Sequence, residues 1–190
     1  MRVLLVDDHE ARAALLKDSL LEAGHEVLGP VSTGADLNEE VRHWAPEVIV
    51  IDVEAPGRDT LEQMRTISRE QPRPIVMFSG TAERSVIKAA ISAGVSAYVV
   101  DGLSAERVQP IMEVAMARFQ EFEALRQDAV RSKALLEERK LIERAKGLLM
   151  STRHCGEAQA YQTLQKMAMD TNRRLVDVAR DVVAINKYLK

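Results

Sequence analysis

Three carboxylates stand directly behind apolar runs in the first part of the chain. Asp7 and Asp8 follow the run RVLLV, and Asp52 follows EVIVI. Because functional residues of an open parallel sheet gather at the carboxyl ends of its strands, we expect these side chains at one edge. Carboxylate oxygens suit Mg²⁺, and Ser79, which follows PIVMF, could hydrogen-bond a phosphoryl group beside Asp52. The alternative is that Asp7 and Asp8 cap a helix and that Asp52 lies in a solvated turn.

Charge is divided unevenly along the chain. Residues 1–139 hold 16 Lys and Arg against 24 Asp and Glu, a net charge of −8, whereas residues 140–190 hold 10 against 5, a net charge of +5. A basic segment joined to an acidic one favours a polyanion as the partner of the basic part, although a basic helical surface can also be merely solvated.

Hydrophobic periodicity indicates the elements that must position these side chains. Apolar runs predict five strands, near residues 2–6, 25–31, 47–51, 74–78 and 97–100. Between them, apolar residues three and four apart predict helices over residues 9–23, 34–44, 60–70 and 83–93. This alternation is typical of the α/β class and predicts a doubly wound, five-stranded parallel sheet.

Residues 104–150 contain one proline and one glycine, which predicts a nearly continuous long helix. Apolar residues recur in it every seven positions, at Ala115, Phe122, Ala129 and Leu136, as in a weak coiled-coil seam. The seam could pair two chains or pack on the rest of the protein, and a homodimer is favoured because Phe122 would otherwise be exposed. Two amphipathic segments after residue 156 can close a small three-helix bundle with the end of the long helix.

Several classes of protein are disfavoured by the composition. Charged residues follow the short apolar run at the N-terminus before a signal-peptide core could form, and no apolar run approaches the roughly 20 residues that span a bilayer. We therefore expect a cytoplasmic protein without a membrane partner. The single cysteine, Cys155, offers neither a disulfide nor a metal-site spacing with the four histidines. With no nucleophile-base pair and no Gly-rich phosphate loop, we expect neither an enzyme nor an organic cofactor.

The motifs VDD, IDVEAP and FSG at the ends of three strands resemble those of the receiver domain of bacterial response regulators, over residues 1–118. The resemblance implies the flavodoxin-like strand order, Asp52 as phosphoacceptor, and Mg²⁺ held by Asp8 and Asp52 with help from Asp7. It also implies that Ser79 and Tyr98 sense the phosphoryl group. One departure is that Asp101 stands where the family has a lysine. We therefore expect the carboxylates to lack a basic partner and phosphorylation to be a weak switch.

The stretches LIERAKGLLM and AYQTLQKMAMDTNRRLVDVA resemble the ANTAR domain of transcription antiterminators, over residues 135–190, after a helical linker at 119–134. The resemblance implies binding of leader RNA with paired stem-loops. Much of the motif is apolar and serves packing, with Gly147 expected to let helices approach closely. The basic residues left for RNA are Arg144, Lys146, Arg153, Lys166, Arg173 and Arg174.

A receiver without its lysine, joined to this tail, is similar to the nitrate-assimilation antiterminators of the NasT branch. That resemblance implies control of nitrate and nitrite assimilation genes, through a sensor protein that binds nitrate. Two alternatives stay open: a DNA-binding response regulator, disfavoured by the long turn at residues 151–159, and a signalling protein whose helical tail serves only to dimerise.

Overall fold

The computed structural model describes residues 1–100 and 105–188, with side chains described except at 105 and 186–188. The chain divides into two compact units, residues 1–123 (the N-terminal unit) and 124–190 (the C-terminal unit). In the described ranges, no helix is both long and apolar enough to cross a membrane.

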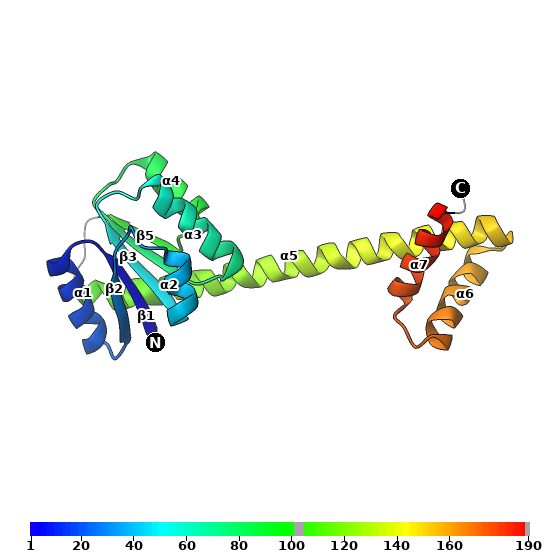
Figure 1. Cartoon of the computed structure of the whole chain (residues 1–190), viewed down its shortest axis with the longest axis horizontal. Coiled ribbons are helices and arrows are strands. Elements are labelled where there is room, and N and C mark those ends of the chain that lie inside the picture. The colour runs from blue at the N-terminus through cyan, green and yellow to red at the C-terminus, as the bar shows by residue number, and fades with distance from the viewer. Residues whose placement is uncertain (101–104, 189–190) are drawn as a thin grey trace. The chain divides into compact units, whose positions relative to one another are not determined.

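The N-terminal unit contains a five-stranded sheet in which every neighbouring pair is parallel. Its strands are β1 (Arg2–Asp7), β2 (Glu26–Val31), β3 (Val48–Val53), β4 (Ile75–Ser79) and β5 (Ala97–Val100). Their order is β2-β1-β3-β4-β5, the flavodoxin-like order, with β3 in the centre (Figure 1). The predicted doubly wound fold is confirmed.

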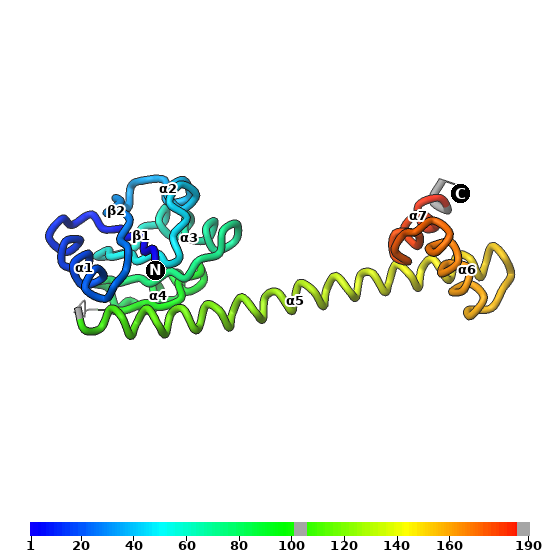
Figure 2. The backbone as a smooth tube through the Cα atoms, turned by 90° about the horizontal axis from the view of Figure 1, so that it is seen from below, coloured from blue at the N-terminus to red at the C-terminus, as the bar shows by residue number. Residues whose placement is uncertain are grey.

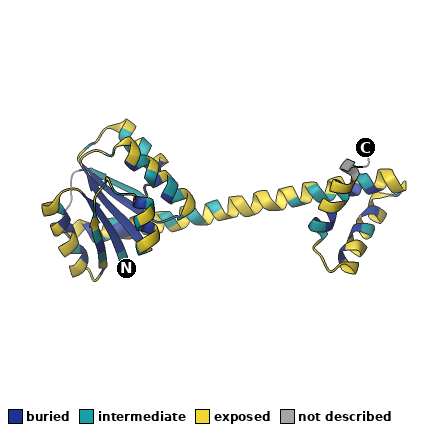
Figure 3. Ribbon diagram, viewed as in Figure 1, coloured by how far each residue is buried: buried dark blue, intermediate teal, exposed yellow. Residues whose placement is uncertain are grey.

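Helices cover both faces of this sheet. They are α1 (Glu10–Glu22), α2 (Leu37–Trp44), α3 (Arg58–Glu70), α4 (Arg84–Ser92) and the first part of α5 (Ala105–Arg153). Residues from α2, α3 and α4 pack on one face, with Val41, Met64 and Ala90 fully buried. Residues from α1 and α5, including Leu16 and Met112, pack on the other. The alternating residues of β1, β3 and β4 are therefore buried on both sides, which explains why these strands read as continuous apolar runs (Figure 3).

The C-terminal unit is built from the end of α5 together with α6 (Glu157–Asp170) and α7 (Leu175–Tyr188) (Figure 2). Its core contains small and branched side chains from all three helices: Ala145, Leu149, Ala160, Leu164, Ala168, Val178 and Ala179. The predicted three-helix bundle is confirmed. Tyr161 and Met167, which share the apolar face of α6 in the sequence, are nevertheless more than one-third exposed.

The middle of α5 differs from the predicted seam at its start. Ala115 is fully buried in the core of the N-terminal unit, so it cannot belong to a coiled-coil surface. Further along, Phe122 and Leu125 are 64% and 65% exposed, and Leu136 is 52% exposed. The seam that is open to a partner therefore begins after Ala115.

Candidate functional site

The acidic edge of the sheet is built by β1 and β3. Asp7 and Asp52 are paired in register at the ends of these neighbouring strands, and their residues are only 5% and 6% exposed. The side chain of Asp8 instead turns to the segment after β2, where it accepts hydrogen bonds from the Ser32 hydroxyl at 2.8 Å and from the Thr33 backbone N–H at 2.9 Å. The Thr33 hydroxyl also donates to Asp8. Two of the three predicted carboxylates therefore lie together, and the third is held elsewhere.

A cation lies beside these two carboxylates, which corrects the expectation that they lack a basic partner. Arg12, in the first turn of α1, places Nη2 3.4 Å from Asp7 Oδ1 and Nε 3.5 Å from Asp52 Oδ2. Sequence analysis did not single out Arg12. Its position four residues after Asp8, at the start of a helix that follows the acidic strand end, is the signal that could have found it.

The electrostatics of Asp52 and Asp8 differ because their surroundings differ. Burial raises the pKa of the Asp52 carboxyl, Arg12 acts in the opposite direction, and the neighbouring Asp7 raises the pKa further. The pKa of Asp8 is lowered, first by the hydrogen bond from the Thr33 hydroxyl and then by that from Ser32. The capping alternative does not hold for α1, since its first residues receive no side-chain cap. Asp7 instead accepts the His9 backbone N–H at 2.7 Å.

The predicted magnesium site requires Asp7, Asp8 and Asp52 to converge. In this arrangement they do not, because Asp8 is bound to Ser32 and Thr33 and a guanidinium stands beside the other two. Across the described residues, no group of three or more His, Cys, Asp or Glu side chains is arranged to hold a metal ion. The residues present therefore do not fit Mg²⁺ in this conformation.

Ser79 and Tyr98, the predicted phosphoryl-sensing pair, belong to one chain of hydrogen bonds. The buried Ser79 hydroxyl donates to the Glu54 carbonyl at 3.0 Å and accepts the Thr81 N–H at 3.3 Å. The Tyr98 hydroxyl donates to the Thr81 carbonyl at 3.0 Å. This chain links the loops after β3 and β4 to β5, and it includes Thr81, which sequence reasoning missed. Asp101 lies outside the described residues.

The basic residues predicted for the tail fall into three groups. Lys146 is buried: its ammonium lies 2.8 Å from Glu143 and 2.6 Å from Glu157, and both hydrogen bonds raise its pKa. It also lies 5.9 Å from the centre of the Tyr161 ring. Contact between Lys146 and RNA would require these ion pairs to open.

The second group is exposed but paired. Arg173 lies 2.6 Å from Asp181, and Arg174 lies 3.2 Å from Asp177 and 3.5 Å from Glu138. The third group is Arg144, Arg153 and Lys166, which are exposed. For none of these three does a carboxylate of the described residues lie within ion-pair distance.

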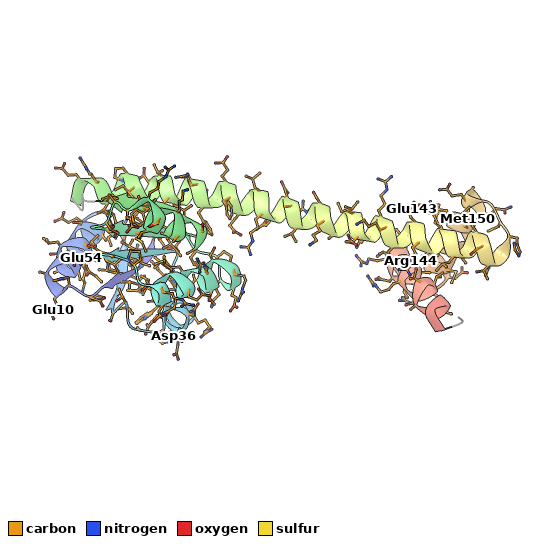
Figure 4. The ribbon with its side chains drawn as sticks, turned by 90° about the horizontal axis from the view of Figure 1, so that it is seen from above. Glu10, Asp36, Glu54, Glu143, Arg144 and Met150 are labelled. Carbon is orange, nitrogen blue, oxygen red and sulfur yellow. The ribbon has the colours of Figure 1, made fainter. Side chains whose placement is uncertain are left out.

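One exposed face of α5 gathers a notable set of residues. Lys140, Arg144, Gly147 and Ser151 are spaced by four, three and four positions, which places them on one side of the helix, and all four are exposed. We call this set the α5 basic face. Arg144 lies on the side of α5 toward α7, where it lines a groove together with Lys140, Val176 and Arg180 (Figure 4).

Gly147 does not serve helix packing as predicted. A Cβ added there would meet no atom within 4 Å outside the neighbouring turns of α5. Glycine inside a helix costs about 1 kcal/mol relative to alanine. Packing within the C-terminal unit does not require this glycine, so it keeps the helix backbone bare on the α5 basic face.

Comparison with known proteins assigns both units. The family model of the response regulator receiver domain matches residues 3–112, and that of the ANTAR domain matches residues 131–183. A relative from Mycobacterium tuberculosis, the transcriptional regulatory protein PdtaR, is 32% identical over 189 residues, covering 98% of this chain and 92% of the relative. The chain belongs to the ANTAR-type response regulators.

Further similarities of this ANTAR regulator cover a smaller share of the chain. The chemotaxis protein CheY of Bacillus subtilis is 29% identical over 108 residues, 56% of this chain and 90% of CheY. Among solved structures, the response regulator CheY4 of Vibrio cholerae matches with a TM-score of 0.53 and 20% identity, over 60% of this chain and 97% of CheY4. A pilus assembly-related protein of Burkholderia pseudomallei matches with a TM-score of 0.56 and 20% identity, over 62% of this chain and 90% of that protein. These structures show the fold of the unit alone.

Proposed function

We propose that this ANTAR regulator is an RNA-binding transcription antiterminator that binds leader RNA with paired stem-loops. The α5 basic face carries the proposal. It combines Arg144, which has no carboxylate of the described residues within ion-pair distance, with Lys140, which is paired with Glu137 at 2.9 Å, and with a glycine whose bare backbone allows close approach of a ligand. Lysine and arginine bind phosphates, and guanidinium planes stack on unpaired bases of RNA loops.

The exposed surface of α7 favours RNA over duplex DNA as the ligand. A DNA-reading helix needs side chains that reach base edges in the major groove. Helix α7 exposes Arg180, Asp181, Ala184 and Ile185 over its described side chains, and the guanidinium of Arg180 lies 2.8 Å from Asp177. A helix with this surface offers little for reading bases, so α5 is the better candidate for nucleic-acid contact.

Two stem-loops call for two ANTAR domains, and we assign a homodimer through the linker part of α5. Exposed apolar side chains on one side of this helix support the assignment: Phe122, Leu125 and, just beyond the linker, Leu136. A helix face with this much exposed apolar surface is stabilised when a second helix covers it. A protein-only signalling role for the tail would explain this face but not the α5 basic face.

We further propose that a bound sensor protein that detects nitrate controls the activity of this regulator. The genes that it regulates would then be those of nitrate and nitrite assimilation. The sequence resemblance and Asp101 in place of a lysine support this assignment. An input shifts a conformational equilibrium only by its differential interaction with the two states, and a phosphoryl group on Asp52 loses the interaction that the family's lysine would supply. Identifying the RNAs that co-purify with the full chain from cells with and without nitrate tests this part.

The antiterminator proposal is tested by equilibrium binding of the full chain to a two-hairpin leader RNA and to duplex DNA of equal length. We expect tighter binding to the RNA, and affinity that falls as salt rises, because phosphate contacts release counterions. Equal affinity for RNA and DNA, or no affinity for RNA, would contradict the proposal.

A further inference from the structure

The first turn of α1 carries a cation into the acidic edge of the sheet. The guanidinium of Arg12 is shared between two buried carboxylates, at 3.4 Å from Asp7 and 3.5 Å from Asp52. The side chain of Arg12 is 37% exposed, whereas those of the two aspartates are 0% and 7% exposed. Arg12 thus covers the carboxylates from the solvent side, and the three groups together carry a charge of −1.

Two polar atoms at this site lack hydrogen-bond partners. Asp7 Oδ2 and Arg12 Nε are both buried and make no hydrogen bond within the described part of the chain. Leaving a buried charged group incompletely bonded is unfavourable, and the approach of the guanidinium partly compensates both carboxylates. Charge attraction holds the arrangement together with one long hydrogen bond, which Arg12 Nη2 donates to Asp7 Oδ1 at 3.4 Å, and Arg12 is the only cation within ion-pair distance of Asp7 and Asp52 in the described ranges.

A divalent cation would have to break two existing arrangements. Mg²⁺ needs near-octahedral oxygen ligands at about 2.0–2.1 Å, so it must reach Asp7 and Asp52 at the position that the guanidinium faces. At that position Mg²⁺ and the positively charged guanidinium would repel each other. The remaining carboxylate, Asp8, is engaged by Ser32 and Thr33 and would have to leave them.

We propose that Arg12 is the resident counter-cation of this pocket and that it excludes divalent cations from Asp7 and Asp52. Arg12 then takes the electrostatic role that a metal ion would otherwise have. The pocket opens to a divalent cation only when the first turn of α1 releases the guanidinium. This inference concerns the N-terminal unit and does not depend on the RNA proposal.

The test is Mg²⁺ titration of the full chain by calorimetry, together with the melting temperature of the N-terminal unit at rising Mg²⁺. The wild type is expected to bind only at or above about 10 mM, since the guanidinium opposes the ion. Arg12→Gln removes the charge and is expected to bind Mg²⁺ at least about tenfold more tightly. Arg12→Lys keeps the charge and is expected to remain near the wild type.

Lys17→Ala is the matched control, because it removes an exposed positive charge from the same helix. It should leave Mg²⁺ affinity unchanged. Saturable wild-type binding at or below about 1 mM Mg²⁺ would overturn the proposal even if Arg12→Gln did not fold. A folded Arg12→Gln protein with wild-type Mg²⁺ affinity would overturn it as well.

Discussion

In the N-terminal unit, the cation beside the functional carboxylates is turned inward: Arg12 covers Asp7 and Asp52. In the C-terminal unit, the cations of the α5 basic face are turned outward, and Arg144 is exposed on a helix side that also carries a bare glycine. An inward cation neutralises the charges of its own unit. An outward cation leaves its charge for a partner. This difference underlies the two proposals, that the acidic edge excludes a further cation and that the basic face binds a polyanion.

The largest expected effect comes from a core substitution that should destabilise the C-terminal unit and leave the N-terminal unit unchanged. Leu164 is fully buried in the core of the C-terminal unit. Leu164→Ala should lower the free energy of unfolding of that unit by about 2–5 kcal/mol, because it leaves a cavity. Hydrogen exchange should show this loss in α6 and α7 and no loss in the sheet. Met169→Ala, at a side chain 79% exposed, is the control and should change stability little. Equal loss in both units would contradict the separation.

A smaller effect is expected from reversing one outward charge. Arg144→Glu should weaken binding of a two-hairpin RNA about tenfold or more and reduce the salt dependence of the affinity, because a phosphate contact is lost. Arg118→Glu reverses a charge at an exposed α5 residue of the N-terminal unit. It should leave RNA affinity and its salt dependence unchanged. RNA titrations at several salt concentrations measure both. If the two variants weaken binding equally, the basic face is not the contact surface.

The smallest expected effect concerns the inward site and its dependence on pH. The pKa of folded Asp52 lies above its ordinary value of 3.8, with burial as the main cause. The folded state therefore binds this proton more tightly, and the contribution of Asp52 to stability is full below 3.8 and lost as pH rises through the raised pKa.

Asn at this position cannot ionise. The melting temperature of Asp52→Asn minus that of the wild type should therefore increase from about pH 4 to pH 7. Melting curves across this range measure the trend. A difference that decreases with pH would show that Arg12 outweighs burial at Asp52.

Periodicity predicted the fold well because β1, β3 and β4 are buried on both faces and the helices of the N-terminal unit on one. Strand β5 begins and ends where the run AYVV predicted, and α5 spans Ala105–Arg153 against a predicted 104–150. Ala115 was assigned to a seam because a heptad pattern cannot distinguish a partner chain from the core of the same unit. The domain limits at residues 118 and 134 stay a prediction.

The candidate sites were predicted less completely, since they depend on contacts between distant segments. The register of β1 and β3 brings Asp7 and Asp52 together, as their positions behind strands indicated. The turn of Asp8 toward Thr33 depends on a loop 25 residues away. The burial of Lys146 depends on Glu157 of α6. The partners of Asp8 and Lys146 are set by side-chain packing between distant segments, and this packing leaves no periodic signal in the sequence.

The most direct test of the account is Gly147→Ala, measured for both stability and RNA affinity in the full chain. Alanine should raise the free energy of unfolding of the C-terminal unit by up to about 1 kcal/mol, because helix propensity improves and the added Cβ meets no other side chain. The account predicts that RNA affinity nevertheless falls, since the Cβ occupies space on the α5 basic face. Ser132→Ala, an exposed helix-favouring change elsewhere on α5, should leave affinity unchanged. A Gly147→Ala protein that is more stable and binds RNA as tightly as the wild type would contradict the account.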